Sequence, residues 1–277
     1  MFLDLLKSIL YGIVEGITEW LPISSTGHLI LLEELVPFAR TSENFFEMYE
    51  VVIQLGAILA VVLLFFKKLW PFARRDDRPG IQVKTNTLNL WVKVLIASLP
   101  AAIIGLPLDD WLDSHLYNKV TVSITLILYG VLFIVVERYN RSRRPRITSL
   151  GDISCSTAAL IGCFQMLALI PGTSRSGATI LGAILIGTAR PVAAEFSFFL
   201  AIPTMAGASL LKLVKFLTHS GFSGGELVIL LVGMIVSFVV SLIAIRGLMR
   251  YVKRKDFSFF GYYRIVLGLI VLAFVLL

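Results

Sequence analysis

Residues 16–28 read GITEWLPISSTGH, and they interrupt an otherwise apolar stretch that runs from residue 3 to residue 36. Each side of the interruption is about half as long as a membrane-spanning helix, which needs about 20 mostly apolar residues. Irregular backbone is tolerated at membrane depth only where it is buried in protein or lines a wet cavity. The stretch therefore predicts a helix–turn–helix hairpin that enters and leaves the membrane on one side, with a polar site at its turn.

A second apolar stretch, residues 155–188, is interrupted in the same way by PGTSRSG at 171–177. Six further segments are apolar over the length that a spanning helix requires. They are 46–66, 87–106, 118–137, 193–215, 226–248 and 259–277. The sequence therefore predicts an all-α polytopic membrane protein, a single integral membrane domain (1–277) with six transmembrane helices and two re-entrant helix–turn–helix hairpins.

The composition agrees with a membrane protein. Hydrophobic residues make up 57% of the chain and charged residues only 16%, against roughly 25% charged residues in a soluble domain. The net charge of +7 could indicate a nucleic-acid partner. However, the basic residues lie in short clusters between apolar runs, which is typical of cytoplasmic loops. We therefore expect this chain to contact membrane lipid and to bind no nucleic acid.

The charge distribution also predicts an orientation. The segments 67–80, 138–146 and 246–256 are rich in lysine and arginine, whereas 107–116 and 216–225 contain neither. Loops that carry an excess of lysine and arginine stay in the cytoplasm. We therefore expect the three basic segments to be cytoplasmic loops and the other two segments, 107–116 and 216–225, to be external loops. Alternation of the spans then places both termini outside.

Because successive spans alternate in direction, the two hairpins have opposite orientations. The first hairpin precedes an outside-to-inside helix and therefore dips in from the outer face, and the second dips in from the cytoplasm. The chain then divides into two halves, each with one hairpin and three spans: 1–140 with hairpin 3–36, and 150–277 with hairpin 155–188. An odd number of spans per half predicts an inverted-topology repeat.

Glu15 and Glu19 are four residues apart, so both carboxylates share one face of a helix. Two acids on an apolar half-helix are costly unless they meet a cation, a metal or water. They are candidates for divalent-metal ligands or for general acid–base catalysis. An interfacial pair whose side chains reach outwards is the alternative.

Ser24, Ser25, Thr26, Gly27 and His28 are expected to open the second half of the first hairpin. A helix N-terminus offers free amide groups and a positive dipole, which together bind anions. The hydroxyls add donors, and one of them becomes a nucleophile if a base lies nearby; His28 could serve as base, acid or phosphate ligand. The plain alternative for Ser24 is a helix cap.

Arg175 lies at the centre of the second turn, where a guanidinium at membrane depth needs an anionic partner. One alternative is an ion pair with Glu15 or Glu19. The other is a phosphate held by the guanidinium, together with the amides and hydroxyls around it. Those candidate phosphate-binding residues are Thr173, Ser174, Ser176 and Gly177.

Three polar residues lie in the predicted spans: Glu50, Gln54 and Glu195. They could support the site from behind, or each could bond a neighbouring helix. Arg264, near the start of the last span, is expected to reach the membrane interface.

Residues 16–28 closely resemble the first signature of the undecaprenyl-diphosphatase family, also called bacitracin-resistance proteins, and residues 171–179 resemble the second. Residues 50–56 and 195–201 are similar as well. The resemblance implies hydrolysis of undecaprenyl diphosphate to the monophosphate lipid carrier of bacterial wall synthesis. It also implies a site at the inner membrane that faces the periplasm or outer surface, aided by a divalent cation (Mg²⁺ or Ca²⁺).

Carried over residue by residue, the resemblance makes Glu15 and Glu19 the acidic pair, Ser25 the nucleophile, His28 the motif histidine and Arg175 the phosphate-binding arginine. Direct attack by water is the alternative to a serine nucleophile. Inverted repeats with broken helices are also an architecture of transporters, so a transporter or a lipid-phosphate flippase is the alternative function. The sequence leaves the oligomeric state open between a monomer and a homodimer.

Overall fold

The computed structural model describes residues 2–39, 41–42, 44–74 and 81–276. The described chain is helical apart from one short antiparallel ribbon of β1 (Phe72–Arg74) and β2 (Ile81–Val83). Within the described residues, five helical segments are long and apolar enough to cross a membrane. They are α3–α4 (Phe45–Leu64), α6 (Thr85–Leu116), α7 (Lys119–Asn140), α10 (Arg190–His219) and α11 (Glu226–Tyr251). The prediction of an all-helical, multi-pass membrane protein is therefore confirmed.

The sixth predicted span corresponds to α12 (Ser258–Leu276), a shorter apolar helix over its well-described part. A four-residue helix, α5 (Phe66–Leu69), leads from α4 into the ribbon. Two arginines of the basic segment 67–80, Arg75 and Arg78, lie outside the described residues, as does Leu277 at the end of the last predicted span.

The outer surface of the bundle is apolar. On α6, for example, Leu95, Leu99 and Ile103 are each more than half exposed. Exposed apolar surface of this extent is unfavourable in water but is the normal lipid-facing surface of a membrane protein.

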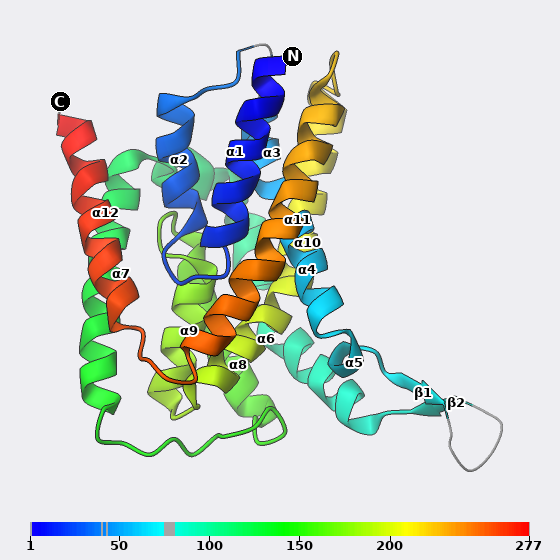
Figure 1. Cartoon of the computed structure of the whole chain (residues 1–277), viewed down its shortest axis with the longest axis vertical. Coiled ribbons are helices and arrows are strands. Elements are labelled where there is room, and N and C mark those ends of the chain that lie inside the picture. Colours follow the sequence, from blue (N-terminus) through cyan, green and yellow to red (C-terminus); the bar gives the residue numbers. More distant parts are fainter. Residues whose placement is uncertain (1, 40, 43, 75–80, 277) are drawn as a thin grey trace.

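Both interrupted stretches form hairpins. The first consists of α1 (Phe2–Thr18) and α2 (Ser25–Leu35), and the second of α8 (Cys155–Met166), the 3₁₀ turn η1 (Leu167–Leu169) and α9 (Arg175–Ile186). In Figure 1 the first hairpin descends from the end of the molecule that holds both termini, and the second rises from the opposite end. Their turns meet near the middle of the bundle.

Small residues let the hairpins approach the spanning helices closely. The α1 helix packs on α11, and α8 packs on α6. A Cβ added to Gly16 would lie 2.8 Å from the Ser237 carbonyl oxygen, and one added to Gly162 would lie 2.3 Å from the Ala97 carbonyl oxygen. Close packing at small residues is a principal source of helix association in lipid, so these contacts fix both hairpins in place.

Two element boundaries differ from the sequence prediction. The segment 107–116, predicted as an external loop, continues α6 as helix. Its acids are neutralised by lysines of α10: Lys215 bonds to Asp109 and Asp110, and Lys212 to Asp113. The first predicted span is interrupted at Ile53, so that Gln54 begins a separate helix, α4 (Gln54–Leu64).

Candidate active site

The two hairpin turns have the same local structure. Ser24 and Ser174 cap α2 and α9, and both have positive φ, 73° and 71°. Each hydroxyl accepts a hydrogen bond from the amide three residues later, Gly27 N at 3.2 Å and Gly177 N at 3.1 Å. A non-glycine residue in this region costs about 1–3 kcal/mol. These two serines and two amides therefore serve to hold the turns in an unusual conformation.

The turns are bonded to one another. The Ser176 hydroxyl donates to the Glu19 carbonyl oxygen at 3.1 Å. Arg264 is fully buried, and its guanidinium donates to the carbonyls of Gly172 (2.8 Å) and Pro22 (3.3 Å), one from each turn. The expectation that Arg264 reaches the membrane interface is wrong, because the irregular turns leave buried carbonyls that need donors.

Three of the predicted catalytic residues come together where the turns meet. The Ser25 hydroxyl donates to Glu19 Oε2 at 2.7 Å, and Arg175 Nη2 lies 3.1 Å from Glu19 Oε1. Arg175 Nη1 donates to the Ser197 carbonyl at 2.8 Å. A hydroxyl bonded to a carboxylate, beside a guanidinium, is suited to nucleophilic attack on an anionic ester or anhydride.

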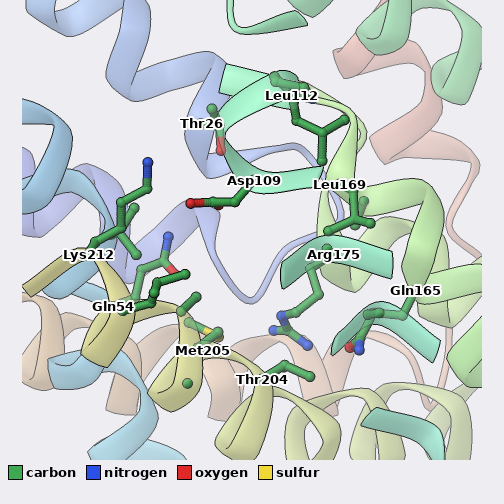
Figure 2. A pocket seen from close by; sticks show the side chains of 18 of the residues that line it. Thr26, Gln54, Asp109, Leu112, Gln165, Leu169, Arg175, Thr204, Met205 and Lys212 are labelled. Atoms are coloured by element: carbon green, nitrogen blue, oxygen red, sulfur yellow. The ribbon is translucent and has the colours of Figure 1, made fainter. Parts of the chain in front are cut away.

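This group opens on a cavity of about 450 Å³. Of the candidate residues named from the sequence, six line it: Glu19, Ser25, Thr26, Gln54, Ser174 and Arg175. In Figure 2, Arg175 lies between Asp109 and Lys212 on one side and Gln165 and Thr204 on the other. Much of the remaining wall is apolar and includes Leu106, Leu169 and Leu211. The cavity therefore combines a charged centre with an apolar wall.

The ion pair expected between Arg175 and an acid of the first hairpin is present, and its partner is Glu19. The pair does not remove the guanidinium from the cavity. Arg175 still lines it, and its Nε has no hydrogen-bond partner among the described residues. The two alternatives of the sequence analysis are thus compatible, since one face of the guanidinium holds Glu19 and another donor stays free.

Other candidates lie behind the cavity wall. Glu15 is fully buried, and neither of its carboxylate oxygens has a partner among the described residues. His28 bonds to the Ser24 carbonyl and to the Tyr263 hydroxyl, each at 2.7 Å, and does not line the cavity. Ser24, Gly27, Thr173, Ser176 and Gly177 likewise belong to the turns rather than to the lining.

The two glutamates predicted in spanning helices have separate environments. Glu50 is buried and accepts a hydrogen bond from the hydroxyl of Tyr117, which does line the cavity. Glu195 forms an ion pair with Lys68 at the start of the basic segment 67–80. Glu50 is thus connected to the cavity through Tyr117, whereas Lys68, the partner of Glu195, does not line the cavity.

Several polar residues of the lining were not predicted from the sequence, among them Gln165, Asp109, Asp113, Tyr117, Thr204 and Lys212. A signal existed for Gln165. Corresponding residues of the two hairpins are 150 positions apart in the sequence, as the caps Ser24 and Ser174 show. By the same offset, Gln165 of the second hairpin corresponds to Glu15 of the first. For the acids of α6 and for Lys212 no local signal existed, because only their pairing across helices brings them to the cavity.

Comparisons with known proteins show the family of this chain. Residues 8–270 match the model of the family described as bacitracin resistance protein BacA. An undecaprenyl-diphosphatase of Acetivibrio thermocellus is 61% identical over 274 residues, 99% of this chain and 98% of the relative. Another of Limosilactobacillus fermentum is 60% identical over 273 residues, 98% of each chain. One of Enterococcus faecalis is 56% identical over 275 residues, 99% of this chain and 98% of the relative. This chain belongs to the bacitracin resistance protein BacA family.

Proposed function

We infer that this chain hydrolyses undecaprenyl diphosphate to undecaprenyl phosphate and inorganic phosphate, and so recycles the lipid carrier and confers bacitracin resistance. The relatives that match it from end to end carry the name undecaprenyl-diphosphatase. The observation that carries the inference is the Glu19–Ser25–Arg175 group at the centre of a partly apolar cavity. The charged centre suits a diphosphate, and the apolar wall suits the first isoprene units of its tail.

In the mechanism that this geometry favours, Ser25 is the nucleophile and Glu19 its base. The Ser25 oxygen attacks the terminal phosphorus, the bond from that phosphorus to the bridging oxygen breaks, and undecaprenyl phosphate leaves. Glu19, which already accepts the hydroxyl hydrogen bond at 2.7 Å, takes the proton. Water then hydrolyses the phosphoserine, which releases inorganic phosphate and returns a proton to Ser25.

Arg175 supplies the positive charge of this mechanism. Its guanidinium would bind the terminal phosphate and stabilise the charge that develops in the transition state. Ion-pairing to Glu19 and bonding to the Ser197 carbonyl hold the guanidinium in a fixed direction before substrate arrives. Such prior fixing avoids reorganisation during the reaction.

A divalent cation, Mg²⁺ or Ca²⁺, would be held by Glu15 and Glu19 together with phosphate oxygens. Glu15 fits this role because both of its buried oxygens lack a partner among the described residues. Among the described residues, no group of three or more His, Cys, Asp or Glu side chains could hold a metal. Substrate oxygens would therefore complete the site, as is usual for Mg²⁺, and the cation would neutralise phosphate charge.

Chelation tests the cation. Adding EDTA to the purified protein should reduce phosphate release by at least about tenfold, because the cation offsets charge on the diphosphate. Mg²⁺ or Ca²⁺ should restore it, and Glu15→Gln should raise the metal concentration needed for half of the activity. Full activity in EDTA would contradict the metal proposal and leave the phosphatase proposal intact.

The fold further supports two inverted repeats with a site that opens to the outer face. The packing is reciprocal: the first limb of each hairpin, α1 or α8, packs on a helix of the other half, α11 or α6. The segments 138–146 and 246–256 lie at the end opposite to the two termini (Figure 1). By the charge rule this end is cytoplasmic and the termini are outside.

Labelling of single cysteines tests this orientation. In a variant without Cys155 and Cys163, Ser220→Cys lies at the end of α10 and Ser142→Cys in the loop after α7; both serines are exposed. A membrane-impermeant maleimide should label the first in intact cells and the second only after permeabilisation. The reverse pattern would invert the proposed topology.

Phosphate release is the experiment that tests the function. The detergent-purified protein is expected to release inorganic phosphate from undecaprenyl diphosphate, with the lipid recovered as monophosphate. The rival function is a transporter or a flippase for a lipid phosphate. Movement of the lipid across reconstituted vesicles by a well-folded protein that releases no phosphate, with divalent metal present, would favour that rival.

A further inference from the structure

Gln165 lines the cavity and has a buried side-chain amide without a hydrogen-bond partner in the described part of the chain. It lies near the end of α8, is only 3% exposed, and neither its Nε2 nor its Oε1 has a hydrogen-bond partner among the described residues. A buried amide without partners costs free energy comparable to a lost hydrogen bond. Such a group therefore points to a ligand that satisfies it.

The surroundings of Gln165 indicate the chemistry of that ligand. In Figure 2 its amide lies at the same end of the cavity as Arg175 and Thr204. The Thr204 hydroxyl donates to the Leu200 carbonyl at 2.8 Å, and the Ser98 hydroxyl donates to the Val94 carbonyl at 2.8 Å. Those two hydrogens are thus already used. Within the described part of the chain, the buried side-chain donors at this end that have no partner are Gln165 Nε2 and Arg175 Nε.

Two free N–H donors, one of them on a cation, form a site for an anion rather than for a hydrocarbon tail. A tail packed here would bury both donors without partners. A phosphate oxygen would accept from both. The correspondence between the two hairpins also favours an anion, since Gln165 takes the place in the second hairpin that Glu15 has in the first. At that place the second hairpin carries a neutral donor instead of an acid, which is what an anion requires.

We propose that Gln165 is a phosphate-binding residue, whose amide donates to the phosphate that Arg175 holds. The proposal rests on the inferred phosphatase function, because it assigns one more ligand to the same diphosphate. The Gln165 amide then compensates for its burial when substrate is bound, and the empty site carries the cost. Stability of the free protein and affinity for phosphate are thereby set against each other at one residue.

Gln165→Leu separates this role from a structural one. The leucine variant should lose about 10- to 100-fold in kcat/KM for undecaprenyl diphosphate, the range for a hydrogen bond to a charged group. Without ligand it should unfold at the same temperature as the native protein or higher, because the unsatisfied amide is gone. Methylenediphosphonate, a diphosphate with a non-hydrolysable bridge, should stabilise the native protein against heat and the variant much less.

Two further variants complete the test. Gln165→Glu keeps the shape but places a carboxylate beside the phosphate, and should lose more kcat/KM than Gln165→Leu does. Gln82→Leu, on the exposed strand β2, removes the same amide outside the cavity and should change nothing. If Gln165→Leu does not fold, Gln165→Met takes its place with the same expectations.

Three outcomes would overturn the proposal. One is a Gln165→Leu protein with native kcat/KM, which would mean that the amide meets only water. Another is a loss of activity that merely follows a lower unfolding temperature. The third is undiminished stabilisation of the variant by methylenediphosphonate. A native protein that releases no phosphate would instead contradict the function itself, so the two failures are distinguishable.

Discussion

Arg175→Lys is expected to reduce kcat/KM for undecaprenyl diphosphate by about 10³-fold, and Arg175→Ala by at least as much. The guanidinium bonds to Glu19 and to the Ser197 carbonyl at once, and its Nε has no partner among the described residues. A lysine ammonium is a point charge on a flexible stem and cannot hold these three directions together. The loss is measured as phosphate release from purified variants with native unfolding temperature.

Arg143→Lys is the matched control, because Arg143 is exposed and its guanidinium lies over the Tyr139 ring, outside the cavity. Its activity should equal that of the native protein. If Arg175→Lys retained a tenth or more of the native kcat/KM, the fixed guanidinium would not be the main source of charge stabilisation.

Ser25→Ala is expected to reduce kcat by on the order of 10⁴-fold, because removal of a nucleophile leaves only binding and charge stabilisation. The native protein, mixed rapidly with substrate labelled in its terminal phosphate, should carry an acid-stable phosphoserine at position 25. Glu19→Gln should form this species slowly, since the amide cannot take the proton that Glu19 Oε2 now accepts.

Ser114→Ala is the control for Ser25, because Ser114 is exposed and does not line the cavity. It should turn over at the native rate. Turnover by Ser25→Ala within about tenfold of native, with no labelled serine, would instead establish direct attack by water. Glu19 would then be the base for that water, and the assignment of Arg175 would be unaffected.

The sequence alone determined the principal elements of the fold. Polar turns that begin near Pro22 and Pro171 inside apolar stretches predicted both hairpins, and long apolar runs predicted the spans. The helical bundle and its apolar helices follow the prediction, because a backbone in hydrocarbon must satisfy its own polar groups, so the pattern of interruption directly reflects the structure. The helical extension of α6 to residue 116 was not predictable locally, since it depends on ion pairs to lysines about 100 residues later.

The site divides in the same way. Glu19, Ser25 and Arg175 could be named from the sequence, because charged and hydroxyl side chains at membrane depth are costly unless they have a task. Which of the named residues share one cavity was decided only by the tertiary structure. In that structure His28 bonds to Tyr263, and Glu195 forms an ion pair with Lys68.

Two arginines illustrate the physical reason. Sequence patterning reports the cost of placing a polar group in hydrocarbon, and it does so equally for Arg175 and Arg264. It does not report which partner offsets that cost. Packing of α12 against α7 brings Arg264 to the buried carbonyls of both turns, whereas Arg175 lines the cavity and its Nε has no partner among the described residues. The sequence determined that such groups must be satisfied from within the bundle; the tertiary structure decided which are satisfied by protein and which are open to substrate.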